Sequence, residues 1–153
     1  MTSRPLHPVD FIEIAAGMKA IQKRALLALT NDKQTLPSLQ RLWDSQPMGA
    51  AFERNGELIA IAGALITHPG VASTFMYATD DFKKVVLEVT HYFKDTLFPL
   101  LKEMGCHRVH SLGLAEDPEG RRWKEDILGA WPEAYLDQYG KDREGFLLHS
   151  IML

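Results

Sequence analysis

The 153-residue sequence predicts an α+β fold, a mixed and mostly antiparallel sheet flanked by helices, in the order (β)ααβββαβαββ. Three observations predict it. Apolar residues recur at helical spacing over residues 10–29 and 80–104, and apolar runs of strand length fill residues 49–78. Asn55-Gly56, between two of those runs, is the strongest short signal for a hairpin turn. A meander followed by helix–strand units places helices on the faces of one sheet.

The first part of the chain predicts two helices. Apolar positions recur every three or four residues over 10–29, after Asp10, and Glu13 follows Asp10 at the spacing of a capping box. Gly17 is a position where this helix can break. A shorter helix is expected between Pro37 and Pro47, because proline is tolerated in the first turn of a helix and disfavours its continuation.

Three strands should follow as a meander. The expected strands cover residues 49–54, 57–67 and 72–78. The Asn55-Gly56 pair favours a type I′ turn between the first two, and His68-Pro69-Gly70 makes a second turn. The two pairs should therefore be antiparallel.

The clearest helix in the sequence covers residues 80–104, where the apolar positions form one continuous stripe. Asp80 or Asp81 is expected to cap it and Gly105 to end it. Pro99 lies on the polar side, where it removes one backbone hydrogen bond and should bend the helix.

The last third predicts a strand at residues 108–114, a short helix at 119–128 that ends at Gly129, and two final strands near 134–139 and 145–152. A polar turn at residues 140–144 should join the final strands. No repeat or linker divides the chain, so residues 1–153 are expected to form one domain.

Composition excludes some classes of partner. The formal net charge of -3 and an isoelectric point near 6.1 argue against nucleic acid and against anionic membranes. The longest apolar stretch, Leu58–Ile66, is too short to cross a bilayer as a helix, and residues 1–10 resemble neither a signal nor a transit sequence. We therefore expect a cytoplasmic protein. Its one cysteine, Cys106, can form no intramolecular disulfide.

Common catalytic motifs are missing from the sequence. Cys106, His107 and His110 have no partners that complete a tetrahedral metal set, so no metal is expected. Ser111 lacks the glycine that a nucleophile elbow needs two residues before the serine. Neither a Walker loop nor a dinucleotide-binding glycine motif occurs.

The order of elements resembles that of the GNAT superfamily, the GCN5-related N-acetyltransferases. Four features carry the resemblance: Arg4-Pro5 ahead of Asp10, the Asn55-Gly56 hairpin, the run 127–131 (Ile-Leu-Gly-Ala-Trp) in place of the family's Leu-Gly-Phe, and the closing run 140–148. It spans nearly the whole chain and implies a single GNAT-like domain. The details are most similar to small GNAT-like proteins of tailed bacteriophages, which include virion components, early proteins that bind a host enzyme, and a protein that targets quorum sensing.

The resemblance implies a site for acetyl-CoA or CoA at the start of the long helix, where backbone N–H groups and the helix dipole favour a pyrophosphate. The family's glycine-rich loop is replaced here by residues 78–84, which contain no glycine. Asp80 and Asp81 would repel phosphate, so binding should be weak. The candidate cofactor-binding residues are Ala78, Thr79, Phe82, Lys83 and Lys84.

The acid tyrosine common in family enzymes is also absent. Counting back from Gly129, the equivalent positions hold Trp123, Lys124 and Glu125. Tyr135 and Tyr139 are the candidates to protonate the leaving thiolate, and Glu53, His68, His91 and His110 are the candidate bases. Packing and solvated surface remain the alternative for all of these residues.

Aromatic and arginine side chains crowd the last third of the chain. Trp123, Trp131, Tyr135 and Tyr139, with Arg121 and Arg122 beside them, are residue types enriched at interface centres. We therefore expect a GNAT-like protein with weakened or absent acetyl transfer that binds a host bacterial protein, such as a metabolic or quorum-sensing enzyme, in the host cytoplasm. The alternatives are an active acetyl-CoA-dependent N-acetyltransferase and a virion component, and a homodimer remains open.

Overall fold

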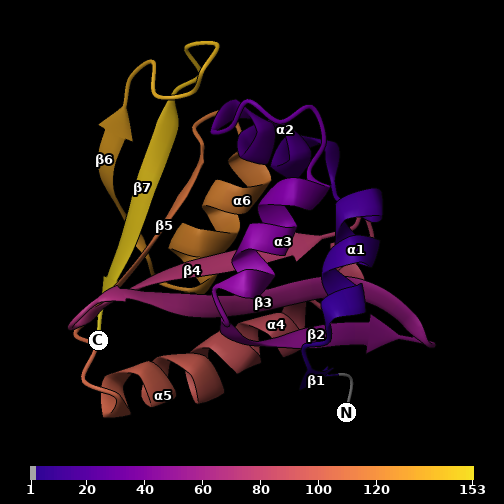
Figure 1. Cartoon of the computed structure of the whole chain (residues 1–153). Helices are drawn as coiled ribbons and strands as arrows, with labels where there is room; N and C mark the ends of the chain where they lie inside the picture. Colours follow the sequence, from indigo (N-terminus) through magenta and orange to yellow (C-terminus); the bar gives the residue numbers. More distant parts are fainter. Residues whose placement is uncertain (1–2) are drawn as a thin grey trace.

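The computed structural model describes residues 3–153, so Met1 and Thr2, the start of the segment tested for a targeting signal, lie outside the described residues. Seven strands form one sheet in the order β1-β2-β3-β4-β5-β7-β6 (Figure 1). Only β4 and β5 are parallel neighbours, and every other pair is antiparallel. The strands are β1 (Ser3–Pro5), β2 (Met48–Arg54), β3 (Glu57–His68), β4 (Val71–Ala78), β5 (Arg108–Leu114), β6 (Trp131–Leu136) and β7 (Phe146–Met152).

Helices cover both faces of the sheet. One face carries α1 (Pro8–Gly17), α2 (Ala20–Ala28) and α3 (Leu36–Asp44). The other carries the long helical run, η1 (Phe82–Lys84), α4 (Val86–His91), the π-helical η2 (Tyr92–Leu97) and α5 (Phe98–Glu103), and also α6 (Pro118–Arg122) with the π-helical η3 (Trp123–Ile127). None of these helices has both the length and the apolar character to span a bilayer, within residues 3–153. The predicted α+β class and element order are confirmed.

Most predicted turns and breaks are confirmed as well. Asn55 and Gly56 have φ values of 54° and 78°, the left-handed pair that a type I′ turn requires. The first helix breaks after Gly17. Gly105 ends the long helical run with φ of 95°, and Gly129 follows η3 with φ of 80°.

Two predictions about helix starts differ from the structure in part. Asp10 does not cap α1: His7 is the N-cap residue, and the buried Asp10 carboxylate accepts the His7 N–H from the third helical position. At the start of the long helical run, Asp81 holds the N-cap position of η1, but its side chain accepts no capping hydrogen bond, and α4 begins only after this 3₁₀ turn.

The final hairpin begins earlier than expected, and the long helical run contains a π segment next to Pro99. β6 begins earlier than predicted, at Trp131, because pairing with β7 starts directly after Gly129 ends the helix, so Tyr139 lies beyond the strand. Pro99 has no N–H to donate, and the helical run widens into the π segment η2 just before it.

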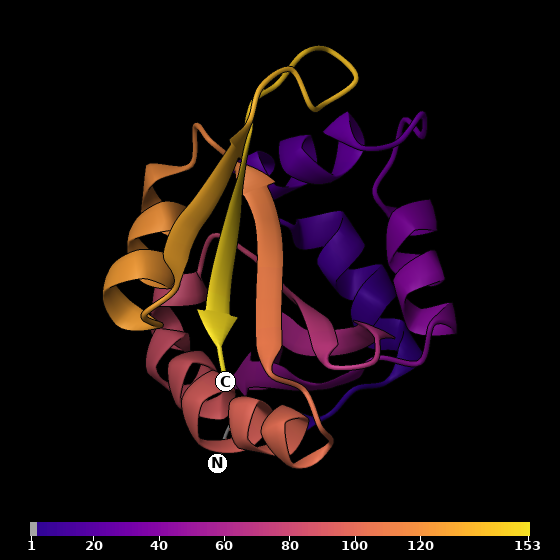
Figure 2. The ribbon, with the colours of Figure 1, turned by 90° about the vertical axis from the view of Figure 1, so that its left-hand side faces the viewer.

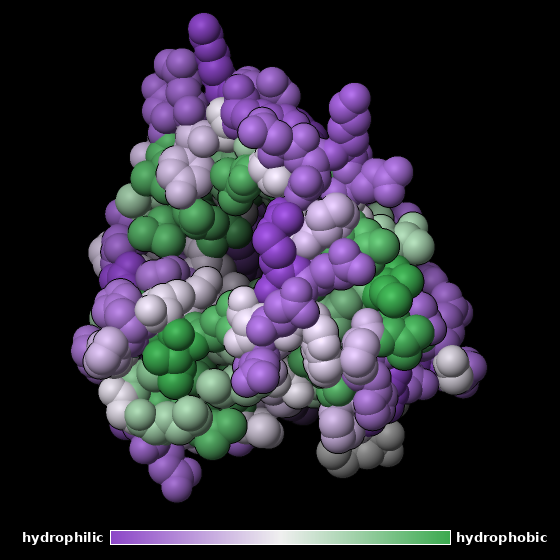
Figure 3. Space-filling model, viewed as in Figure 1, coloured by the Kyte–Doolittle hydropathy of each residue, from purple (hydrophilic) through white to green (hydrophobic). Residues whose placement is uncertain are grey.

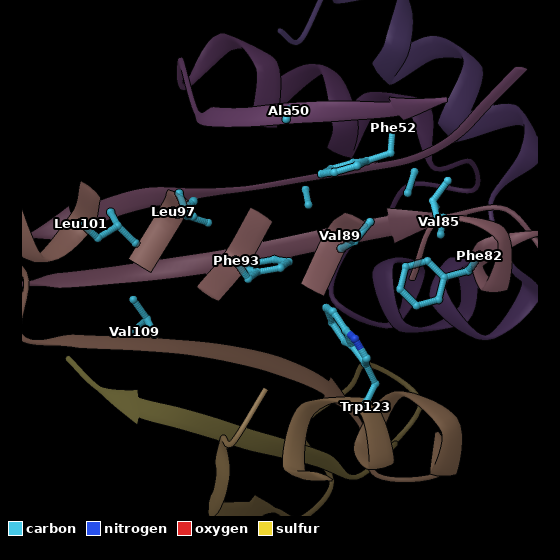
Figure 4. Close-up of a cluster of buried hydrophobic side chains, with 14 of the residues drawn as sticks. Ala50, Phe52, Phe82, Val85, Val89, Phe93, Leu97, Leu101, Val109 and Trp123 are labelled. Atoms are coloured by element: carbon cyan, nitrogen blue, oxygen red, sulfur yellow. The ribbon is translucent and has the colours of Figure 1, made fainter. Parts of the chain in front are cut away.

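The core lies in two layers, one on each side of the sheet. Alternate residues of β3 divide between them: Ala60 and Ala62 face the long helical run, and Ile61 faces α1 and α3. The small alanine side chains leave room for Phe93 and its neighbours on the helix (Figure 4).

The sheet opens between its two parallel strands. Pairing of β4 with β5 is confined to Val71–Ser73 and Arg108–His110, after which the strands diverge (Figure 1). We call β1 to β4 the N-terminal half-sheet and β5, β7 and β6 the C-terminal half-sheet. The space between the diverging parts of β4 and β5 is called the notch.

Candidate functional site

The notch holds a cavity of about 160 Å³. Its walls come from both half-sheets, from α2 and from the helical pair α6 and η3. Figure 3 shows a hollow near the middle of the face that carries α1 to α3. The volume is close to that of an enclosed cavity that admits benzene, so the notch has room for a short acyl group.

The edge of β4 that faces the notch is already hydrogen-bonded to α2. The Gln22 side-chain Nε2 donates to the Met76 carbonyl at 3.2 Å, and its Oε1 accepts the Ala78 N–H at 2.8 Å. The Lys19 N–H donates to the Ala78 carbonyl at 2.9 Å. An exposed strand edge would bind the amides of an extended ligand. Here a primary amide of the protein itself takes that position.

The turn at residues 79–85, ahead of α4, offers few free amides to a phosphate. The Asp81 N–H donates to the Thr79 hydroxyl at 3.3 Å, and the other bonds of the turn run backbone to backbone. The amides paired in this way are those of Thr79, Asp81, Phe82, Lys84 and Val85. An anion site at a helix start depends on unpaired N–H groups. In this turn, most N–H groups already donate a hydrogen bond within the protein.

Aromatic rings fill the space between this turn and η3. The Phe82 and Trp123 rings meet edge to face with centroids 5.6 Å apart, and Trp123 also contacts Phe93 (Figure 4). The Trp123 Nε1 donates to the Thr90 hydroxyl at 3.1 Å, and the Lys19 Nζ lies 4.8 Å from the centre of the Phe82 ring. The long helical run and η3 are therefore bridged by buried side chains.

Two ionisable side chains reach the cavity from η3 and β7. The Lys124 Nζ lies over Gly113 of β5, and burial lowers the pKa of Lys124. His149 is almost fully buried, and burial lowers its pKa despite a hydrogen bond with Glu125 at 2.9 Å. The Nδ1 of His149 has no partner among the described residues.

A second polar group holds the base of the C-terminal half-sheet together. Arg108 donates two hydrogen bonds to Glu133, at 2.6 and 2.7 Å, and the Ser150 hydroxyl donates to the same carboxylate. Hydrogen bonds from Arg108 and Ser150 lower the pKa of Glu133 to about 2. These contacts join β5 to β6 across β7.

The structure brings the predicted cofactor-binding residues together at the end of β4. Ala78 and Phe82 are buried, and Thr79 is half-buried. Lys83 and Lys84 are exposed on the turn, and the Lys84 Nζ lies 3.6 Å from the Asp81 carboxylate.

The predicted catalytic residues lie apart from one another. Glu53, at the end of β2, forms an ion pair with Arg4, and neither residue lines the cavity. Tyr135 is exposed on β6, and its hydroxyl lies close to Gly145; Tyr139 is exposed and its ring packs against Phe146. Of the candidate bases, only His110 lines the cavity, where burial lowers its pKa.

Sequence reasoning missed Gln22 and His149, and it considered Lys124 only as a position without tyrosine. A glutamine in a helix and a histidine in a strand belong to no motif. The available signal was at Gly113, a glycine inside a strand, which often marks the close approach of another group.

Comparisons with known proteins support the fold. No protein-family model and no curated protein sequence matches the chain. Several solved structures match it. Ribosomal-protein-alanine N-acetyltransferase from Brucella melitensis has a TM-score of 0.71, at 14% identity over all of both chains. A variant of spermidine N-acetyltransferase from Vibrio cholerae has a TM-score of 0.72, at 14% identity over 99% of this chain and 95% of the other.

A third neighbour was solved with a cofactor. The protein yncA of Salmonella typhimurium, with its cofactor acetyl-CoA, has a TM-score of 0.69, at 14% identity over 99% of this chain and 93% of the other. At such low identity the likeness establishes the fold alone. The chain therefore has the fold of the GNAT N-acetyltransferases, as its sequence predicts.

Proposed function

We propose that the protein acts by binding another protein, with acetyl transfer weakened or absent. One observation carries the proposal that acetyl transfer is weakened or absent. The Gln22 carboxamide is hydrogen-bonded to the β4 edge and occupies the backbone groups with which the arm of CoA could pair. The closed turn at residues 79–85 supports it, because it leaves few N–H groups for a pyrophosphate.

Exposed apolar side chains on the C-terminal half-sheet support the docking role. Leu112, Trp131 and Met152 are 38%, 53% and 55% exposed, on adjoining strands. Figure 2 shows α6 on one side of this half-sheet and α1 to α3 on the other. Tryptophan is among the residues that contribute most to binding when an interface buries it. The partner implied by the resemblance to bacteriophage proteins is a host bacterial protein, such as a metabolic or quorum-sensing enzyme.

An active N-acetyltransferase is the second candidate function. The cavity in the notch and the amine of Lys124 inside it favour this reading. Thr79, Lys83 and Lys84 would then hold the phosphates from the exposed side of the turn.

A thermal shift with acetyl-CoA separates the two candidates. A ligand at a hundred times its dissociation constant stabilises a protein by about 2.7 kcal/mol, a rise of several degrees in Tm at this size. We expect no shift at millimolar acetyl-CoA, and a clear shift would favour the enzyme.

Capture from bacterial lysate then tests the docking role. The wild-type chain should retain a partner that Trp131→Ala loses, while an exposed change on the other half of the molecule, Lys33→Ala, keeps it. Equal retention by all three chains, or self-association alone in a sizing experiment, would contradict the proposal.

A further inference from the structure

The amine of Lys124 occupies an unusual place inside the notch. Lys124 belongs to η3, and its side chain crosses to β5, where Nζ lies 2.8 Å from the position that a Cβ on residue 113 would take. A side chain at residue 113 would displace the Lys124 amine from this position. The sequence thus provides a strand position without a side chain under the amine.

No acceptor holds this amine. Within residues 3–153, no hydrogen bond or ion pair within 4.0 Å joins the Lys124 Nζ to another group, and the only charge that favours its protonation is Asp117, whose carboxylate caps α6. A lysine that serves structure usually ends at a carboxylate or in water. Lys124 is half-buried, and its amine ends beside the cavity with no carboxylate in contact.

The groups around Lys124 favour the neutral amine. Burial lowers its pKa, and His149 of β7 faces the same cavity and keeps Glu125 engaged through a hydrogen bond. Arg121 also donates to Glu125, at 2.6 Å. The Glu125 carboxylate, next to Lys124 in the sequence, is therefore already bonded twice. A neutral lysine amine is a nucleophile, and a protonated one is not.

We propose that Lys124 is an acyl-acceptor site, at which the lysine amine takes a short acyl group from a thioester. The amine nitrogen attacks the thioester carbonyl, an N–C bond forms, and the C–S bond breaks. The thiolate leaves and receives the proton that the nitrogen loses. The products are an amide on Lys124 and a free thiol. The cavity of about 160 Å³ has room for an acetyl group beside the amine.

The site does not depend on the proposed function. A short thioester without a nucleotide can enter the cavity even where the β4 edge and the helix start cannot hold CoA. Acylation would remove the charge of Lys124 and fill the cavity, so it would change the notch without any change at the surface of the C-terminal half-sheet.

The test compares lysines within one wild-type protein. The folded chain is incubated with the acetyl thioester of N-acetylcysteamine and, separately, with acetyl-CoA, and the acetylated lysines are quantified by peptide mass spectrometry over time. Each unit by which a lysine pKa falls raises its reactive fraction at neutral pH about tenfold. We therefore expect Lys124 to react faster than the exposed Lys83 and Lys84 with the short thioester.

Two controls make the result specific. Lys124→Met should remove one acetyl group from the intact mass without a change in the Lys83 and Lys84 rates, and urea-unfolded wild type should acetylate all lysines at one rate. Lys124 reacting no faster than Lys83 in the folded chain would overturn the proposal. Fast reaction with the short thioester but not with acetyl-CoA would support both this site and the weak cofactor binding. Fast reaction with both would support the site and contradict the weak binding.

Discussion

The two half-sheets are built differently. The N-terminal half-sheet is covered by helices on both faces, and β2 and β3 contribute side chains such as Phe52 and Ile61 that are fully buried. The C-terminal half-sheet has less cover, and it leaves Leu112, Trp131 and Met152 exposed. The strand ladder between the two parts covers three residue pairs, Val71–Ser73 with Arg108–His110.

We infer from this difference that the N-terminal half-sheet mainly stabilises the fold and that the C-terminal half-sheet provides the surface for recognition. Burial of apolar area is the main favourable contribution to folding, so most of the free energy of unfolding should reside in the N-terminal half-sheet and its helices. Exposed apolar side chains contribute little to that free energy and are available to a partner. The notch lies at the seam, where groups from both parts meet without a continuous ladder of hydrogen bonds.

Among the predictions, the largest change in the free energy of unfolding is expected for a substitution at Arg4. Its guanidinium donates two hydrogen bonds to the fully buried Asp10, at 2.7 and 2.8 Å, and also pairs with Glu53. Burial raises the pKa of Asp10, but the hydrogen bonds from Arg4 and His7 together lower it. Arg4→Met would leave a buried carboxylate without its partner, which costs about 3–5 kcal/mol. Urea unfolding should show a loss of this size.

Arg24 provides the matched control. Its ion pair with Glu116 is exposed on both sides, and such pairs contribute about 0–1 kcal/mol. Arg24→Met should therefore change the free energy of unfolding very little. Equal losses for the two variants would mean that the buried Asp10 carboxylate gives its ion pair no more weight than an exposed pair has.

A smaller effect is expected at Glu133 of the C-terminal half-sheet. The pKa of Glu133 is about 2 in the folded chain, because Arg108 and Ser150 donate hydrogen bonds to it, and about 4.3 in an unfolded chain. A lowered folded pKa stabilises the protein above the unfolded pKa, and this contribution is lost as the pH falls toward about 2.

Acid unfolding of wild type and Glu133→Gln measures this contribution. Wild type should lose more stability than the variant between pH 5 and pH 2.5, and the two curves should run parallel above pH 5. A constant difference across the whole range would show that the carboxylate charge contributes nothing.

The sequence was sufficient for the order of elements, because helical spacing, glycine and proline are local signals. The predicted strand at 108–114 coincides with β5, and the Asn55-Gly56 turn has the expected backbone. Asp10 was misread as a cap because its true partner, Arg4, lies six residues away on a strand.

The interior of the notch could not be predicted in the same way. Gln22 bonds to β4 across more than fifty residues of chain, and Lys124 reaches Gly113 through a π-helical turn. No local pattern marks either contact. The absence of the family's glycine loop and tyrosine was visible in the sequence, but the side chains that line the notch could not be identified from it.

A calorimetric titration with acetyl-CoA tests most directly whether the Gln22 side chain prevents cofactor binding at the β4 edge. Gln22→Ala frees the Met76 carbonyl and the Ala78 N–H, and two hydrogen bonds of about 1 kcal/mol each correspond to a gain in affinity of about tenfold or more. We predict no measurable binding to wild type or to the exposed control Lys23→Ala, and measurable binding to Gln22→Ala. Tight binding to wild type that Gln22→Ala leaves unchanged would contradict the account.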